Sequence, residues 1–258
     1  MSTTHLVILL GATALLVVAH TGCSSGDAWV RDVAPPPNAP LIRERGWVDA
    51  PAPVAPAGRP MAAAPAGADD GIPWRNTYYD FPHEKAGTRD AVVFDAACKP
   101  IASVTKEFHD KVCVQGSGRL AAGATISFAK RDCPCAASCP RTDQKICFEK
   151  LDPAKFPHGR GATGGAIAPF RSVAVDVSLV PLGSVLFIRE YQGLRRLDGT
   201  THDGCFRAED RGLKVVGRHL DVFTGSEEGT ASWNRAVPSN EGVHALLDAP
   251  DCRHLAVP

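Results

Sequence analysis

From about Ile72 onward, the chain consists mostly of short apolar runs separated by turn residues, which is the pattern of β-strands. Each run is rich in β-branched or aromatic residues, and Gly, Pro or charged residues bound most of them. The runs that we predict as strands are Ala91 to Phe94, Lys111 to Val114, Ala124 to Phe128, Ser172 to Val175, Ser184 to Ile188 and His219 to Phe223. Many short strands joined by turns are typical of a closed all-β barrel.

Helical periodicity is weak in the same region. Short helices are expected at Val104 to Lys111 and at Glu228 to Ala236, and there is neither an internal repeat nor a long amphipathic helix. About 185 residues follow Ile72, which is enough for one domain with a substantial core. We therefore expect a single, mostly β domain over residues 72–258.

The N-terminus has the pattern of an export signal. Leu6 to Ala19 is an almost unbroken apolar run, which is too short for a transmembrane helix of about 20 residues. The small residues just before Cys23 resemble the lipobox of bacterial lipoproteins, in which this cysteine carries the lipid. We expect a signal peptide over residues 1–22 and a lipid on Cys23; a plain cleaved signal and a short uncleaved anchor are the alternatives.

The segment over residues 23–71 is rich in Pro and Ala and poor in large apolar residues. Proline removes backbone donors and stiffens an extended chain, so this segment is unsuited to a core. We interpret it as a linker between the lipid anchor and the folded domain. With export, this organisation predicts a lipoprotein of the cell envelope, attached to the outer membrane and facing the periplasm.

The cysteines support an oxidising compartment. The chain has nine of them, and eight remain when Cys23 is set aside, all between Cys98 and Cys252. An even number in an exported chain indicates up to four disulfides. The alternative is a zinc site in the cluster from Cys133 to Cys147, but its gaps of one, three and seven residues do not fit the usual paired spacing.

Composition and charge exclude few classes of function. The formal net charge is zero, and no basic stripe is present, so nucleic acid is not an expected partner. The contents of 22% charged and 44% hydrophobic residues are those of an ordinary globular domain.

Three aspartates have an unusual context. Asp176 follows an apolar run, Asp210 follows the segment from Cys205 to Glu209, and Asp221 lies inside an apolar strand. A buried carboxylate is costly unless it has a partner, so such residues often have a function. Taken singly, each could equally lie on the solvent face of its strand.

The segments around these aspartates resemble the three-aspartate domain shared by the membrane-bound lytic transglycosylase A family and related wall proteins. The matching segments, in order, are Thr77-Tyr78-Tyr79, the Gln-Gly-Ser-Gly motif at 115–118, the Ala-Val-Asp segment with Pro-Leu-Gly-Ser at 174–184, and the pair Asp210 and Asp221, eleven residues apart. The resemblance implies a six-stranded double-psi β-barrel with short helices, carrying here a disulfide-rich insertion.

The chain also departs from the family pattern. Leu213 replaces a glycine, and Val216 replaces the usual lysine. The family's large inserted second domain is not recognisable, and the stretch between Gly118 and Arg171 holds the cysteine cluster instead. These differences concern the extent of the glycan groove more than the acid itself.

The family cleaves the β-1,4 bond between N-acetylmuramic acid and N-acetylglucosamine without water and leaves a 1,6-anhydro sugar. By resemblance, Asp221 is the single general acid/base, and Asp210 and Asp176 support it. The resemblance also assigns substrate contacts, of which Tyr78 would stack on a sugar face. The other expected contact residues are Gln115, Ser117 and Gly118.

The expected partner is the peptidoglycan glycan strand, with the membrane reached through the lipid anchor. We expect a monomer and neither a cofactor nor a metal. His219 shares a strand face with Asp221 and is a further candidate for substrate contact. Two rival functions remain: a barrel that binds peptidoglycan without cleaving it, and a metal-binding domain that uses the three aspartates as oxygen ligands.

Overall fold

The computed structural model describes residues 70–256, all of which lie in one compact unit that spans Pro60–Pro258. The signal peptide, Cys23 and nearly all of the linker over residues 23–71 lie outside the described residues. Across the described residues, no helix is both long enough and apolar enough to cross a bilayer.

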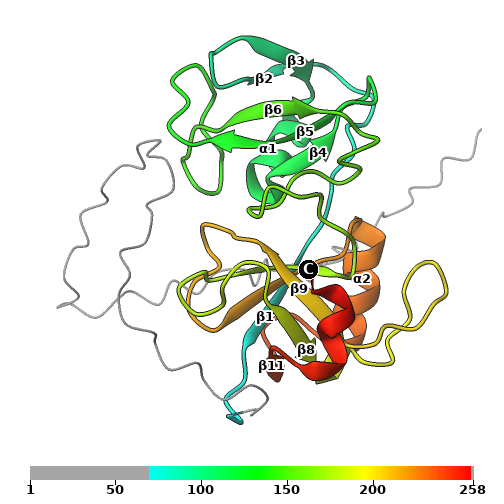
Figure 1. Ribbon diagram of the computed structural model, residues 1–258. Helices are drawn as coiled ribbons and strands as arrows, with labels where there is room; N and C mark the ends of the chain where they lie inside the picture. The colour runs from blue at the N-terminus through cyan, green and yellow to red at the C-terminus, as the bar shows by residue number, and fades with distance from the viewer. Residues whose placement is uncertain (1–69, 257–258) are drawn as a thin grey trace, which may run out of the picture. The chain divides into compact units, whose positions relative to one another are not determined.

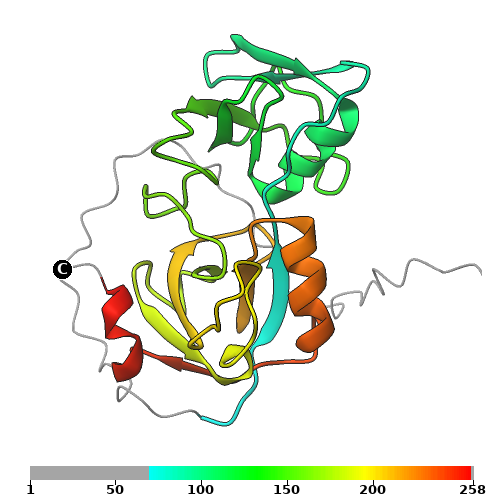
Figure 2. The same cartoon turned by 90° about the vertical axis from the view of Figure 1, so that its right-hand side faces the viewer.

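A six-stranded sheet carries most of the core (Figures 1 and 2). Its order is β1-β10-β7-β9-β8-β11. The strands are β1 Arg75–Tyr79, β7 Ser172–Val175, β8 Val185–Ile188, β9 Cys205–Asp210, β10 His219–Phe223 and β11 Ala245–Leu247. β1 and β7 pair in parallel with β10 and β9 respectively, and the other three pairings are antiparallel.

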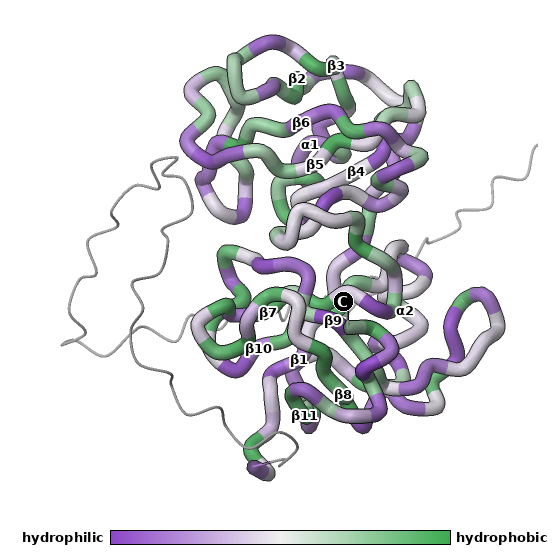
Figure 3. Tube along the Cα trace, viewed as in Figure 1, coloured by the Kyte–Doolittle hydropathy of each residue, from purple (hydrophilic) through white to green (hydrophobic). Residues whose placement is uncertain are grey.

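Side chains alternate between the two faces of this sheet, as the period of two along a strand requires. One face forms the main apolar core, and hydrophobic residues run along β8 and β10 (Figure 3). Its members include Val173, Leu186, Phe206, Leu220 and Val222. The opposite face carries a smaller apolar cluster around Tyr79, Ala174 and Phe223, next to the polar residues described below.

The two outer strands of this order, β1 and β11, are linked just outside their ladders. Trp74 and Val243 exchange both backbone hydrogen bonds, at 2.7 and 2.8 Å. The chain is mostly β, as the pattern of apolar runs predicted. Within the described part, the pairing of β1 with β11 is limited to this one bridge.

Residues between β1 and β7 form two further sheets with their own apolar core. β2 Ala91–Phe94 pairs with β3 Pro100–Val104, and β4 Ser117–Arg119, β5 Thr125–Lys130 and β6 Cys147–Leu151 form the three-stranded sheet. Phe108, Val112, Ile126 and Phe148 are buried in this core. We refer to residues 82–168 as the insertion.

The predicted strand from Lys111 to Val114 is wrong, because these residues lie in helix α1, Lys106–Gln115. The Thr105 side chain caps the helix by accepting from the Phe108 N–H, and Gly116 ends it in the left-handed conformation with φ 78°. Val112 and Cys113 are β-branched and small residues of the kind found in strands, but here they form the buried face of the helix. The other predicted strands are confirmed within one or two residues.

Helix α2, Glu227–Ala236, runs alongside β1 (Figure 2). Ser226 caps it, and Trp233 stacks on Tyr191 at 5.2 Å between ring centroids in the main core. Two short 3-10 helices, η1 Arg189–Tyr191 and η2 Pro250–Leu255, complete the elements.

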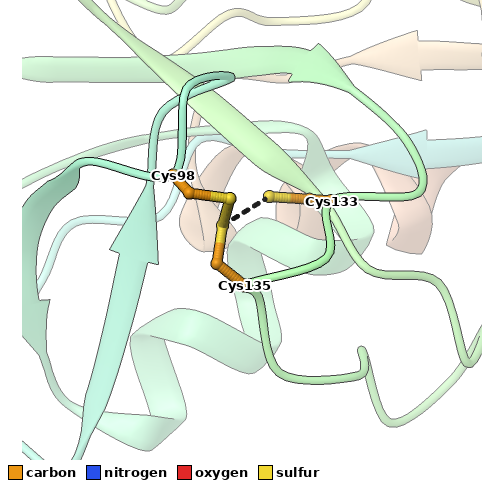
Figure 4. A group of neighbouring side chains, drawn as sticks. All are labelled: Cys98, Cys133 and Cys135. Carbon is orange, nitrogen blue, oxygen red and sulfur yellow. Dashed lines mark hydrogen bonds between the residues drawn. A yellow bond between two sulfur atoms is a disulfide. The ribbon is translucent and has the colours of Figure 1, made fainter.

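All eight cysteines after Cys23 are paired. The disulfides are Cys98–Cys135, Cys113–Cys139, Cys133–Cys147 and Cys205–Cys252, of which the first three lie in the insertion. Cys133 Sγ lies 3.4 Å from Cys135 Sγ (Figure 4), and this is a contact between two disulfides because neither sulfur carries a hydrogen. The cluster that spacing alone left open to zinc therefore consists of cross-links.

Peptide mapping of the non-reduced protein by mass spectrometry is expected to recover these four pairs. Eight cysteines allow 105 connectivities, so agreement by chance is improbable. The sharpest check is at the close contact of Figure 4. A peptide linking Cys98 to Cys133, or Cys135 to Cys147, would contradict the pairing, and a reduced sample provides the control for assigning each mass.

Candidate active site

Four residues form one row across four neighbouring strands of the six-stranded sheet. Thr77 of β1 is the register partner of Asp221 in β10, Asp221 is the partner of Ala174 in β7, and Ala174 is the partner of Asp210 in β9. Register partners share a face of a sheet. The small side chain of Ala174 thus separates two carboxyl groups on the same face.

A β-bulge places Asp210 in this row. Val173 pairs with Ala208, but Ala174 pairs with Asp210, so Glu209 is an extra residue in β9. Without the bulge, Asp210 would share the core face of Ala208, because residues two apart in a strand point the same way. The peptide at the bulge is held by the insertion, since the Thr163 N–H donates to the Glu209 carbonyl at 3.2 Å.

Asp221 has the environment of an acid. Thr77 Oγ1 lies 2.6 Å from Asp221 Oδ1. Burial raises the pKa of Asp221 to about 6, with a further contribution from the Asp210 charge, against the lowering effects of the Thr77 hydroxyl and of Arg75. Within residues 70–256, Oδ2 of Asp221 has no protein hydrogen-bond donor.

Asp210 is held by hydrogen bonds on several sides. The Tyr79 hydroxyl donates to Oδ2 at 3.2 Å, the Arg211 N–H donates to Oδ1 at 2.9 Å, and the Ala162 backbone also contributes. Burial raises its pKa to about 6, and these hydrogen bonds oppose the rise. Asp210 is therefore a positioned carboxyl group beside Asp221.

Asp176 lies two residues beyond Ala174, and its carboxylate serves the backbone. Oδ1 accepts from the N–H and hydroxyl of Ser178, and Oδ2 accepts from the Gly217 N–H at 2.7 Å. These donors hold the pKa of Asp176 below its usual value. Asp176 thus fixes the turn after β7 to the loop that leads into Asp221.

Tyr78 lies on the opposite face of β1 from Thr77. Its hydroxyl donates to the Val237 carbonyl, and its ring meets Tyr191 edge-on at 6.2 Å. The structure therefore does not bring Tyr78 to the aspartates. Tyr79 is the aromatic residue of β1 that reaches them, through its bond to Asp210.

The Gln-Gly-Ser-Gly motif ends helix α1 and begins β4. Gln115 Oε1 accepts from the Asp80 N–H, just after β1, at 3.2 Å. Ser117 is buried and its Oγ lies 2.7 Å from Ser127 Oγ. Gly118 packs so closely on Phe108 and Val112 that an added Cβ would approach a Val112 methyl to 2.6 Å.

In this motif, Ser117 and Gly118 have packing roles inside the insertion, whereas Gln115 connects the insertion to the end of β1. None of the three makes a hydrogen bond to the aspartates among the described residues.

Two histidines also lie on the site face. His219 Nε2 is 2.8 Å from Thr77 Oγ1. The His158 ring meets Phe81 and Phe223 edge-on at 5.5 and 5.8 Å, and burial lowers its pKa. Alternation along β10 pointed to His219, but no sequence signal marks His158, because a long-range approach of the insertion brings it there.

The three aspartates do not gather their oxygens at one point. In the described part of the chain, groups of three potential ligands lie close together only at Cys98, Cys133 and Cys135 and at Asp203, Cys205 and His254. The cysteines of both groups are in disulfides. The oxygens of Asp176 are engaged by backbone and hydroxyl donors instead.

Comparison with known proteins identifies the family of the domain that carries this site. Residues 171–236 match the family described as 3D domain, so the chain contains a 3D domain that includes all three aspartates. A comparison with curated protein sequences found no match.

The fold is similar to that of a solved membrane-bound lytic murein transglycosylase from Agrobacterium tumefaciens. The TM-score is 0.50 at 16% identity, and the match covers 70% of this chain and 75% of that chain. E. coli MltA with bound chitohexaose also matches, at a TM-score of 0.49 and 16% identity, over 70% of this chain and 72% of that chain.

Because the pKa of Asp221 is raised, ionisation of this residue should make the folded protein less stable. A carboxyl group with a higher pKa in the folded than in the unfolded state binds more protons when folded, so stability falls as pH rises from about 4 through about 6. Asp221→Asn should therefore leave stability nearly unchanged at pH 4 and raise it by up to about 3 kcal/mol at pH 7.5. Urea unfolding at both pH values measures this difference.

Asp176→Asn is the matched control with the opposite sign. Because hydrogen bonds lower the pKa of Asp176, its ionised form stabilises the fold above the unfolded-state pKa, and this stabilisation disappears as pH falls. The variant should be less stable than the parent at pH 7.5 and should approach it at low pH. The same sign of effect for both variants would contradict the assignment.

Proposed function

We propose that the protein is a lytic transglycosylase that cleaves the β-1,4 bond between N-acetylmuramic acid and N-acetylglucosamine in peptidoglycan, without water, to give 1,6-anhydro ends. The observation that carries the proposal is the hydrogen bonding of Asp221, a carboxyl group of raised pKa: Thr77 holds one of its oxygens, and the other has no protein donor among the described residues, whereas both oxygens of Asp210 are engaged. The 3D domain and the fold are compatible with this activity.

One carboxyl group is sufficient for this reaction. The protonated Asp221 donates to the glycosidic oxygen as the bond to C1 breaks and positive charge develops on the sugar. The C6 hydroxyl then attacks C1, and its proton returns to the Asp221 carboxylate. Protons balance over the cycle, whereas a hydrolytic glycosidase needs a second carboxylate as nucleophile or as base for a water.

Asp210 is suited to support rather than to a second catalytic role. Both of its oxygens accept hydrogen bonds from Tyr79 or from the backbone, so it is poorly placed to activate a water. Its charge beside Asp221 contributes to the raised pKa of the acid. Asp176 supports the site one step further away, through Gly217.

For the fold, we propose that the six-stranded sheet closes as a double-psi β-barrel. Parallel pairs on both sides of β10–β7 and the bridge between Trp74 and Val243 at the two outer strands support this topology. Closure at this bridge would bury Trp74 against the main core, of which it is a member.

For the location, we propose an exported lipoprotein of the outer membrane that faces the periplasm, acts as a monomer and binds glycan strands. The four disulfides support an oxidising compartment. The lipid would be on Cys23, and the proline-rich linker would let the domain reach the wall.

Asp221→Asn tests the acid. The amide keeps the shape of the side chain but cannot donate an acid proton, and such groups contribute roughly 10²–10⁴-fold to rate. Release of 1,6-anhydro-muropeptides from purified sacculi, measured by mass spectrometry, should fall at least about a hundredfold, while binding to sacculi is retained. Asp176→Asn should be milder, because Asp176 holds a loop.

Two outcomes would change the proposal. Anhydro sugar release by Asp221→Asn at the parent rate would exclude Asp221 as the acid. If the folded parent binds sacculi but releases no anhydro sugar, the protein is a peptidoglycan-binding domain instead.

Cys23→Ser tests the anchor in cells. The parent should incorporate a labelled fatty acid and sediment with membranes, and the variant should do neither, because serine cannot take the thioether-linked lipid. Cys98→Ser serves as the control for the loss of a cysteine elsewhere. Equal labelling of the parent and Cys23→Ser would contradict lipidation at this position.

A further inference from the structure

His219, Thr77 and Asp221 form a chain of hydrogen bonds with a fixed end. The His219 Nδ1 lies 3.1 Å from the Lys214 carbonyl oxygen, and Nε2 lies 2.8 Å from Thr77 Oγ1. Thr77 Oγ1 lies 2.6 Å from Asp221 Oδ1. A carbonyl oxygen can only accept, so Nδ1 carries a hydrogen, and a neutral His219 presents a bare Nε2 to the hydroxyl.

The Thr77 hydroxyl has one hydrogen but faces two groups that can require it. If Asp221 is ionised and His219 is neutral, both neighbours are acceptors, and one of the two short contacts is left without a hydrogen. If Asp221 is protonated, it donates to Thr77, and Thr77 donates to His219. If His219 is protonated, it donates to Thr77, and Thr77 donates to the Asp221 carboxylate.

The last two arrangements satisfy every contact and hold the same number of protons. Only the arrangement with ionised Asp221 and neutral His219 leaves a lone pair facing a lone pair within a half-buried site, which is costly. The hydrogen bonds through Thr77 therefore oppose the loss of the last proton that His219 and Asp221 hold between them. Arg75, Asp210 and Tyr79 face these groups from β1 and β9 and bias the pair, but none can supply the missing hydrogen to Thr77.

We propose that His219 is a positioning residue that, through the Thr77 hydroxyl, keeps the acid proton on Asp221. The proposal rests on the proposed function only for its catalytic consequence; the hydrogen-bond coupling is a property of the folded protein by itself. Its direction is consistent with the lowered pKa of His219, which favours the neutral ring and hence the protonated Asp221.

His219→Gln tests the coupling. The glutamine amide can either donate to or accept from Thr77, so ionised Asp221 no longer leaves an unmatched contact. We expect the basic limb of the pH profile of kcat/KM for anhydro sugar release to move down by about one unit, the equivalent of one net hydrogen bond. Activity should thus fall about tenfold at pH 7 and little at pH 5. His244→Gln, at a histidine paired with Glu190, should leave the profile unchanged.

A double-mutant cycle shows whether the effect passes through Thr77. Thr77→Val removes the hydroxyl at nearly constant shape. In this background, His219→Gln should no longer shift the basic limb of the pH profile of kcat/KM. Thr77→Ser retains the hydroxyl and should behave like the parent. A shift of equal size with and without the hydroxyl, or no shift at all, would overturn the proposal.

A direct titration separates this proposal from the proposed function. Carboxyl carbon NMR of Asp221, assigned by comparison with Asp221→Asn, reports its ionisation without any substrate. The Asp221 titration should move to lower pH in His219→Gln and stay in place in His244→Gln. If sacculi yield no anhydro sugar but the titration moves, the coupling stands and the enzymatic proposal fails; an unmoved titration in folded His219→Gln refutes the coupling whatever the activity.

Discussion

The register of four strands is the constraint on which the site depends. Hydrogen-bonded pairing puts Thr77, Asp221, Ala174 and Asp210 side by side, and one extra residue in β9, Glu209, decides that Asp210 belongs to this row. Since a shift of one residue moves a side chain to the other face, a regular β9 would turn Asp210 towards the apolar core. In a regular β9, Glu209 would stand opposite Ala174 in place of Asp210, so the bulge decides which of these two carboxyl groups lies beside Asp221.

Placement in the middle of a sheet gives the acid a fixed set of neighbours. Side chains on loops can adapt to a new charge, whereas Thr77 and Asp210 are held by strands on both sides of Asp221 and its partner Ala174. The energetic cost of the buried carboxyl groups is offset by the core on the opposite face, where Leu220 and Val222 of the same strand are fully buried. One strand thus contributes both the buried apolar side chains that stabilise the sheet and the buried carboxyl group whose pKa is raised.

The strands and the acidic motifs could be predicted from the sequence because both depend on the local pattern of residues. The strands at Ser172–Val175 and His219–Phe223 follow from β-branched runs, and the three aspartates follow from their motifs. The local pattern does not distinguish Tyr78 from Tyr79, because two adjacent aromatics carry no sign of which face is the core. The bulge at Glu209 and the approach of His158 depend on long-range pairing, and neither leaves a signal in the local sequence.

The insertion contacts the strands of the site at two places. Gln115 receives the Asp80 N–H just after β1, and Thr163 donates to the bulged Glu209. Three disulfides cross-link the insertion, and such cross-links stabilise a fold mainly by restricting its unfolded chain. The backbone of Ala162 and Thr163 holds the bulged end of β9, so the position of Asp210 beside Asp221 depends on the insertion as well as on the sheet.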